Sequence, residues 1–204
     1  DAAELADLLV AGGFAEPVHH AQSVFRMMMD CLSRPGTVQS IEPEIDPPRP
    51  LGVAAGAIAL TLLDHDTPVW LTPGLAKSAV AEWIGFHTGA PLTREKSEAR
   101  FAFAEAGVPF SSFGLFATGT QEYPDRSTTI VLEVASLDKG APLSLSGPGI
   151  RESATIAPQG LPEMFLRQWA DNRALFPRGV DVVLTAGRQM LGLPRTCKIM
   201  PREV

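Results

Sequence analysis

The sequence predicts an α/β fold in which a mixed β-sheet lies between layers of helices, a three-layer α/β/α arrangement. Helical and short apolar segments alternate through most of the chain, which is typical of a sheet covered by helices. The last strands follow one another too closely for helical crossovers, so antiparallel pairing is expected towards the C-terminus. Hydrophobic residues make up 45% of the 204 residues and charged residues 20%, as in ordinary globular proteins. This length fits a single domain, predicted to span 1–204.

The first strongly patterned segment predicts a helix over 17–33. Pro35 and Gly36 directly after it prevent its continuation. Arg26 and Asp30 lie four residues apart and are expected to pair on one face. The predicted buried side consists of apolar residues at helical spacing: Val18, Ala21, Phe25, Met28, Met29 and Leu32.

The rest of the chain supplies further strands and helices in alternation. Segment 51–63 predicts a helix that is apolar nearly all round and therefore covered on several sides. Segment 128–134 is the clearest strand because it is rich in β-branched residues, and the four prolines of 42–50 indicate an extended connector. The other predicted strands are 37–41, 68–71, 101–104, 143–146, 180–185 and 189–193. The other predicted helices are 162–175 and 75–86, the latter with Ala76, Ala79, Val80 and Trp83 towards the core.

Charge and hydropathy exclude several classes of partner. The net charge is -6 and no run of lysines or arginines occurs, so no nucleic acid partner is expected. The longest apolar run, 51–63, is shorter than the roughly 18 to 20 residues of a membrane span, so no membrane partner is expected. The N-terminal sequence DAAELADLLV is acidic and helical in pattern, unlike a secretory signal, which indicates a cytoplasmic protein.

The sequence offers weak candidates for covalent or metal chemistry. Cys31 lies in the last turn of its predicted helix, where the helix dipole disfavours a thiolate, although Arg34 is a nearby cation. Cys31 and Cys197 have no CxxC spacing, so neither an iron–sulfur cluster nor a thiolate zinc site is indicated. Asp64-His65-Asp66 offers three potential ligands, but such residues at a turn also cap the backbone. We therefore predict no catalytic residue and no metal, and retain Asp66 as a candidate for ligand or interface contact.

A glycine-rich turn is the strongest candidate for binding an anion. Ser146-Gly147-Pro148-Gly149 lacks the third glycine of a dinucleotide-binding GxGxxG motif, and its proline removes one backbone donor. The segment is either a tight turn or a nest of backbone N–H groups that holds an anion with Arg151 nearby.

Arginines beside predicted loops form the second group of candidates. Arginine suits bidentate contacts to carboxylate or phosphate, in ligand sites and across subunit interfaces alike. Exposed surface pairs are the third interpretation, and such pairs contribute little to stability. The residues concerned are Arg34, beside Gly36, and Arg126, Arg178 and Arg195.

Several motifs together resemble the family of H subunits (PhnH) of the bacterial carbon-phosphorus lyase system, which degrades phosphonates. No single motif is specific, but they occur in family order along nearly the whole chain. They are FRMMMDCLSRPGTV at 25–38, LLDHDTPVWL at 62–71, FHTGAPL at 86–92, Gly119-Thr120, IVLEVASL at 130–137, LSLSGPGI at 143–150, and FPRGVDVVLTAG with LGLPRT near the end.

The resemblance implies a fold related to the large domain of pyridoxal-phosphate transferases, without the cofactor. Such a transferase needs a lysine for its Schiff base. The four lysines lie in polar helical or loop surroundings, in a turn, or near the terminus: Lys77, Lys96, Lys139 and Lys198. We therefore expect no bound cofactor.

The resemblance also implies a role in a multi-subunit assembly. The family is expected to form homodimers in isolation and to work with the G, I and J subunits. With the G, I and L proteins it is required for making ribose 1-phosphonate 5-triphosphate from ATP and phosphonate. The chain lacks the cysteines of the radical-forming J subunit, so we expect a structural, non-catalytic subunit. The alternative is a nucleotide- or phosphonate-binding enzymatic subunit that uses the arginines and the glycine-rich turn.

Overall fold

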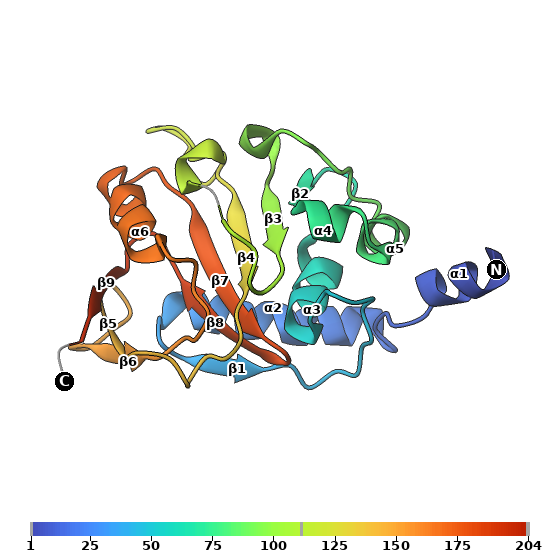
Figure 1. Ribbon diagram of the computed structural model, residues 1–204, viewed down its shortest axis with the longest axis horizontal. Helices are drawn as coiled ribbons and strands as arrows, with labels where there is room; N and C mark the ends of the chain where they lie inside the picture. Colours follow the sequence, from blue (N-terminus) through green and yellow to red (C-terminus); the bar gives the residue numbers. More distant parts are fainter. Residues whose placement is uncertain (1, 111, 203–204) are drawn as a thin grey trace.

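A computed structural model describes residues 2–110 and 112–202. The strands of its main sheet are β1 (Val38–Ser40), β2 (Val69–Leu71), β3 (Phe101–Ala104), β4 (Thr129–Glu133), β7 (Asp181–Ala186) and β8 (Gln189–Leu193). They lie in the order β1-β8-β7-β4-β3-β2 (Figure 1). Strands β2, β3, β4 and β7 are parallel, while β8 is antiparallel to β7 and β1 to β8. The predicted mixed sheet and the antiparallel pairing of the last strands are confirmed.

The helices occupy the predicted positions: α2 has the predicted bounds, α3 and α6 are shorter than predicted, and the predicted helix 75–86 is divided in two. They are α1 (Ala2–Val10), α2 (Pro17–Ser33), α3 (Val53–Leu62), α4 (Pro73–Ala76), α5 (Ala79–Thr88) and α6 (Phe165–Ala174), with 3-10 turns η1 (Lys96–Glu98) and η2 (Phe113–Leu115). Among the described residues, no helix combines the length and apolar character needed to cross a membrane.

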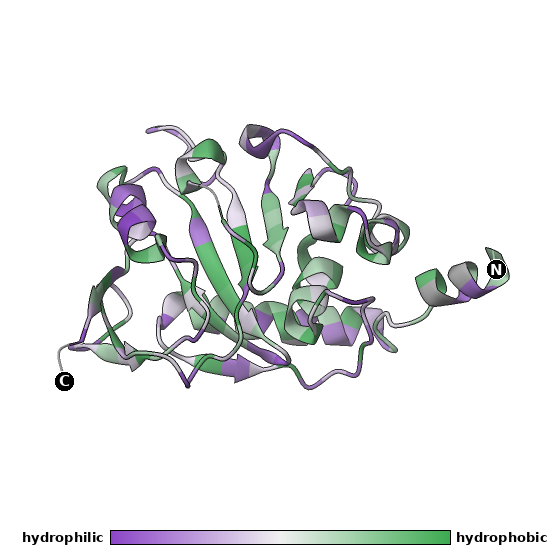
Figure 2. Ribbon diagram, viewed as in Figure 1, coloured by the Kyte–Doolittle hydropathy of each residue, from purple (hydrophilic) through white to green (hydrophobic). Residues whose placement is uncertain are grey.

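The central strands of the main sheet are buried on both faces because their inner positions are almost all apolar. Successive side chains of a strand point to opposite faces. Val131 and Val183 pack in one cluster with α2, α3 and α5, and their neighbours Ile130 and Val182 pack in a second cluster with α6 and η2. Figure 2 shows this apolar character as hydrophobic colouring along most of the central strands, with a hydrophilic section near the start of β7. The sheet therefore separates two cores.

A second, three-stranded sheet was not foreseen. It comprises β5 (Leu143–Ser146), β6 (Ala154–Ile156) and β9 (Lys198–Pro201), antiparallel in the order β6-β5-β9. Leu143, Leu145 and Ile156 pack in the same cluster as α6. The third layer is thus one α-helix and a small sheet, which modifies the expected α/β/α layering on that face.

The predicted buried side of α2 was wrong in part. Val24, Met28 and Cys31 face the core, whereas Phe25 is 46% and Met29 41% exposed. Val18 is also exposed, at 70%. Residues 24, 28 and 31 form a stripe at helical spacing just as the predicted set does, and α2 is apolar on both sides, so periodicity alone did not choose between them. The packing of α2 against α3 and β8 makes the choice.

Ser78 divides the predicted helix 75–86 into α4 and α5. Its hydroxyl donates to the Leu75 carbonyl at 2.7 Å and accepts from the Val80 N–H at 3.2 Å, which makes it the N-cap of α5. Val80 and Trp83 are buried as predicted, but Ala76 is exposed. The Trp83 indole donates to the Ala11 carbonyl at 3.1 Å and so ties α5 to the segment after α1.

Candidate functional site

Two segments singled out from the sequence meet in space: the loop 33–36 after α2 and the turn 146–149 after β5. Gly149 has a φ of +80°, and a Cβ there would collide with the Ser33 carbonyl oxygen. Gly36 has a φ of +94°, and a Cβ there would lie 2.8 Å from the Cβ of Ala154. Both positions need glycine, because each has a positive φ and a neighbouring atom lies where a side chain would begin.

The close packing also accounts for the remaining residues of the turn 146–149. Gly147 has a φ of +133°, and a Cβ there would lie 2.9 Å from the Thr196 carbonyl oxygen. Ser146 pairs with Lys198 at the end of the β5–β9 ladder. Arg151, two residues beyond the turn, is exposed. The glycines are therefore explained by contact between segments, with no bound anion required.

Arg34 lies at this junction and forms an ion pair with Asp30. Its Nε donates to Oδ1 of Asp30 at 2.8 Å and its Nη2 to Oδ2 at 2.7 Å. Gln39 donates to the same carboxylate at 2.6 Å. The hydrogen bonds from Arg34 and then from Gln39 hold the pKa of Asp30 below its ordinary value. Asp30 thus pairs with Arg34, where the sequence predicted Arg26, and the Arg34 side chain stays 61% exposed.

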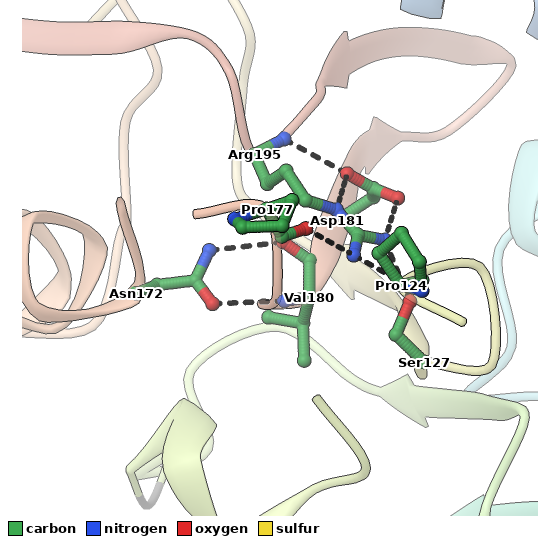
Figure 3. A network of polar contacts seen from close by, with 7 residues as sticks. All are labelled: Pro124, Ser127, Asn172, Pro177, Val180, Asp181 and Arg195. Atoms are coloured by element: carbon green, nitrogen blue, oxygen red, sulfur yellow. Dashed lines mark hydrogen bonds and ion pairs between the residues drawn. The ribbon is translucent and has the colours of Figure 1, made fainter. Parts of the chain in front are cut away.

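Arg195 holds three segments together within the protein (Figure 3). Its guanidinium forms a bidentate pair with Asp181, with Nη2–Oδ2 at 2.7 Å and Nε–Oδ1 at 3.2 Å. It also donates to the Pro124 carbonyl at 2.7 Å and to the Ser127 hydroxyl at 2.6 Å. Beside it, Asn172 exchanges two hydrogen bonds with the backbone of Val180, at 2.8 and 2.9 Å. Arg195 is only 12% exposed, so its donors serve internal contacts.

The other candidate side chains have surroundings of their own, outside the Arg195 network. The Arg126 guanidinium stacks over the Tyr123 ring at 4.0 Å from its centroid. The Nε of Arg178 is buried without a hydrogen-bond acceptor among the described residues. Asp66 is 84% exposed, beside His65 at 3.3 Å.

The capping interpretation of 64–66 is the one that the geometry supports. The Asp64 carboxylate accepts from the Thr67 hydroxyl at 2.7 Å and from the Asp66 N–H at 2.9 Å. These bonds, the Thr67 bond first, lower the pKa of Asp64. The described residues contain no cluster of three or more His, Cys, Asp or Glu side chains suited to a metal ion.

Both cysteines lie in buried surroundings typical of structural residues. Cys31 and Cys197 are free and buried, at 0% and 1% exposure. Burial in apolar surroundings raises the pKa of each thiol to about 11, so neither is a thiolate near neutral pH. The low nucleophilicity predicted for Cys31 agrees with this environment.

One group of residues that line a cavity was not singled out from the sequence. Trp70, Lys77 and Arg94 line a cavity of about 570 Å³ beside β2. They come from a strand, an interhelical position and a loop, so no spacing rule connects them. The only sequence signal was the presence of isolated cations near a predicted strand end.

The fold and these contacts define an α/β protein with a mixed sheet, in which Arg195 and Arg34 pair with carboxylates of the same chain. The family model of the bacterial phosphonate metabolism protein PhnH matches residues 12–200, and the chain belongs to this family. The ordered motifs that indicated the family are thereby confirmed.

Two relatives agree with this assignment. The chain is 58% identical over 191 residues to the alpha-D-ribose 1-methylphosphonate 5-triphosphate synthase subunit PhnH of Rhizobium meliloti (strain 1021), covering 94% of this chain and 96% of the relative. It is 30% identical over 184 residues to the putative C-P lyase subunit protein HtxG of Stutzerimonas stutzeri, covering 87% and 85%.

Proposed function

We propose that this chain is the H subunit of a cytoplasmic carbon-phosphorus lyase assembly, required with other subunits to join a phosphonate to ribose triphosphate. The observation that carries the proposal is the 58% identity to a synthase subunit over 94% of this chain and 96% of the relative. The match runs almost end to end in both sequences.

Within that assembly we propose a structural, non-catalytic role. The described thiols are buried with raised pKa values, and Arg195 uses its donors internally. The relation to the large domain of pyridoxal-phosphate transferases stays a prediction, and we expect no absorbance of an internal aldimine in the purified protein.

The surface that supports an assembly role lies on α2. Val18, Phe25 and Met29 are 70%, 46% and 41% exposed and recur at spacings of seven and four, so they lie along one side of the helix. We assign this side of α2 to contact with another subunit of the assembly, because exposed apolar side chains in a row are typical of interaction surfaces. The expected partners are the G, I and J subunits, and a second copy of the chain in isolation.

Co-purification tests this function. Tagged G, I or J subunits should retain the wild-type chain, and deletion of the chain should abolish growth on a phosphonate as phosphorus source. The double variant Phe25→Glu with Met29→Glu should fold but be lost from the assembly. Phe86→Glu, at a phenylalanine that is 58% exposed on α5, is the matched control and should be retained. Normal growth after deletion would refute the proposal.

The ligand-binding alternative is favoured by one observation. The loop 33–36 and the turn 146–149 pack together. Two arginines with exposed side chains are close in sequence to this junction: Arg34 in the loop, and Arg151 two residues beyond the turn. Calorimetric titration with ATP and an alkylphosphonate tests it. Saturable binding that Arg34→Ala or Arg151→Ala abolishes would support this site, whereas binding unchanged by both would exclude it.

A further inference from the structure

A cavity of about 570 Å³ lies at the carboxyl end of β2, the edge strand of the main sheet. Trp70, Leu71 and Leu92 contribute apolar lining, and Lys77, Thr93 and Arg94 contribute polar groups. Figure 1 shows β2 and α4 side by side at this end of the sheet. The volume falls within the roughly 300 to 1,000 Å³ of small-molecule sites.

Segment 91–93 pairs with part of the edge strand β2 beside this cavity. Val69 donates to the Pro91 carbonyl and accepts from the Thr93 N–H, both at 2.9 Å, so segment 91–93 covers the edge there. Thr72 donates in the opposite direction, to the Phe103 carbonyl of β3. The backbone N–H groups of successive strand residues point to opposite sides of the strand. The N–H of Leu71 therefore points to the same side as that of Val69. The cavity therefore has a backbone donor beside its apolar lining.

The charge of the cavity is opposite to that of the protein. The chain carries a net charge of -6, yet Lys77 and Arg94 line this cavity and none of its lining residues is acidic. Two carboxylates lie beside the lining and have hydrogen-bond donors: Glu105 accepts from the Thr72 hydroxyl, and Glu98 accepts from the hydroxyl of Thr93, itself a lining residue, at 3.3 Å. Two cations in one concave site attract anions, and arginine adds a bidentate fork for phosphate or phosphonate oxygens.

The Trp70 ring of the cavity packs against two neighbouring side chains. The Lys96 ammonium lies 5.0 Å from the centroid of the Trp70 ring, and Phe116 contacts that ring edge-to-face at 5.4 Å. An indole fixed in this way offers a rigid surface for a ring or another apolar group of a ligand. An inorganic anion would use the cations and leave this surface unused.

We propose that this cavity binds a small organic phosphate, with its phosphate or phosphonate group between Lys77 and Arg94 and its organic part against Trp70 and Leu71. The inference rests on the proposed function, because a relative is named as a synthase of a ribose 5-triphosphate. It differs from the alternative at Arg34 and Arg151 in location and in the residues that it requires.

Trp70 provides a direct readout. It is the half-buried tryptophan, while Trp83 and Trp169 are 0% and 1% exposed. The purified chain is titrated with ATP, methylphosphonate and inorganic phosphate, and binding is measured by tryptophan fluorescence and by calorimetry. ATP should change the Trp70 signal and bind more tightly than inorganic phosphate. Methylphosphonate separates recognition of the phosphonate group from recognition of the larger organic part.

Substitutions locate the site. Lys77→Ala and Arg94→Ala should each weaken ATP binding about tenfold or more, the effect of losing one charge-assisted contact. Lys139→Ala, at an exposed turn, and Arg173→Ala, which lines smaller cavities of about 260 and 330 Å³ beside α6, are matched controls and should bind normally. Circular dichroism melts confirm that each variant is folded.

Three results would overturn the inference. They are the absence of binding to all three probes, equal affinity for ATP and inorganic phosphate, and loss of binding in Arg173→Ala, Arg34→Ala or Arg151→Ala with Lys77→Ala and Arg94→Ala unaffected. The proposed assembly role is tested separately by co-purification. A chain that joins the assembly but binds none of the probes would refute the cavity site alone.

Discussion

Arg195 illustrates how an arginine that looks like a ligand residue can instead hold the fold together. It joins β7, through Asp181, to the loop that contains Pro124 and Ser127. Arg195→Ala leaves a largely buried carboxylate and two further acceptors without their donor, which we expect to destabilise the protein by about 3 kcal/mol. Urea unfolding followed by circular dichroism measures this change.

Arg34→Ala is the control for that prediction. Arg34 forms the same bidentate contact with Asp30, but its side chain is 61% exposed against 12% for Arg195. Water replaces the lost contact at an exposed site, so the urea midpoint should move far less. Equal shifts for the two variants would contradict the structural role assigned to Arg195.

The buried thiols make stability depend on pH in the alkaline range. An ordinary thiol ionises near pH 9.0, whereas burial raises the pKa of Cys31 and Cys197 to about 11. Between these values the unfolded chain has lost protons that the folded chain keeps, so stability falls as pH rises from about 9 to about 11 and is fully present below about 9. The double variant Cys31→Ala with Cys197→Ala should show a smaller fall in urea midpoint between pH about 8 and about 10.5. An identical fall would rule out the thiols as its cause.

The sequence identified individual residues more readily than it indicated which of them lie close together in the fold. Arg34 and Gly149 were both candidates, but their segments lie more than 100 positions apart in the chain and only tertiary packing shows that they meet. Arg195 was indistinguishable from an exposed arginine because its acceptors are backbone carbonyls and a distant carboxylate. Trp70 and Arg94 were missed since nothing in their local sequence indicates a shared cavity.

At the scale of elements, α2 shows where periodicity stops being decisive. Its bounds, 17–33, were predicted correctly because Pro17, Pro35 and Gly36 have local effects. Its buried side was predicted wrongly in part, because apolar residues, among them adjacent methionines, lie on two sides of the helix. Which side faces inward depends on α3 and β8, and that information is not local.

Adjacent methionines test the observed orientation of α2. Met28 is 3% exposed and Met29 41%. Met28→Ala should lower the free energy of unfolding by about 2 to 5 kcal/mol, because it leaves a cavity in the core. Met29→Ala should change it by less than about 0.5 kcal/mol. Urea unfolding of both variants decides, and the reverse order of effects would mean that the helix presents its other side to the core.

The contact between the loop after α2 and the turn after β5 is tested by a pair of glycines. Gly149 and Gly107 have nearly the same φ, +80° and +79°, but only at Gly149 does a Cβ meet another atom, the Ser33 carbonyl oxygen. Gly107→Ala should lose about 1 kcal/mol from backbone strain alone. Gly149→Ala should lower the free energy of unfolding clearly more, since the turn 146–149 or the loop 33–36 must also move. Similar losses in thermal melts would show that the junction is loose.

At the scale of the whole molecule, the main sheet was predictable and the small sheet was not. The strands of the main sheet are apolar at consecutive positions, so the sequence indicated a sheet buried on both faces. Strands β5, β6 and β9 are short and bring 143–146 together with 154–156 and with 198–201. The pairing of β5 with β9 spans about 50 residues of sequence, and such a pairing leaves no local pattern.

Because one sheet contributes to both cores, the chain should unfold as a single cooperative unit, which is the prediction of one domain in a measurable form. Trp83 lies in the core beneath α5 and Trp169 in the core beneath α6. Variants that retain only one of these tryptophans, with phenylalanine at the other two positions, report on each core in turn. In each variant the urea midpoint from tryptophan fluorescence should coincide with that from far-ultraviolet circular dichroism, as in two-state unfolding. A fluorescence midpoint clearly below the dichroism midpoint in one variant would mean that its core melts first, and that the two layers are separate folding units sharing a sheet.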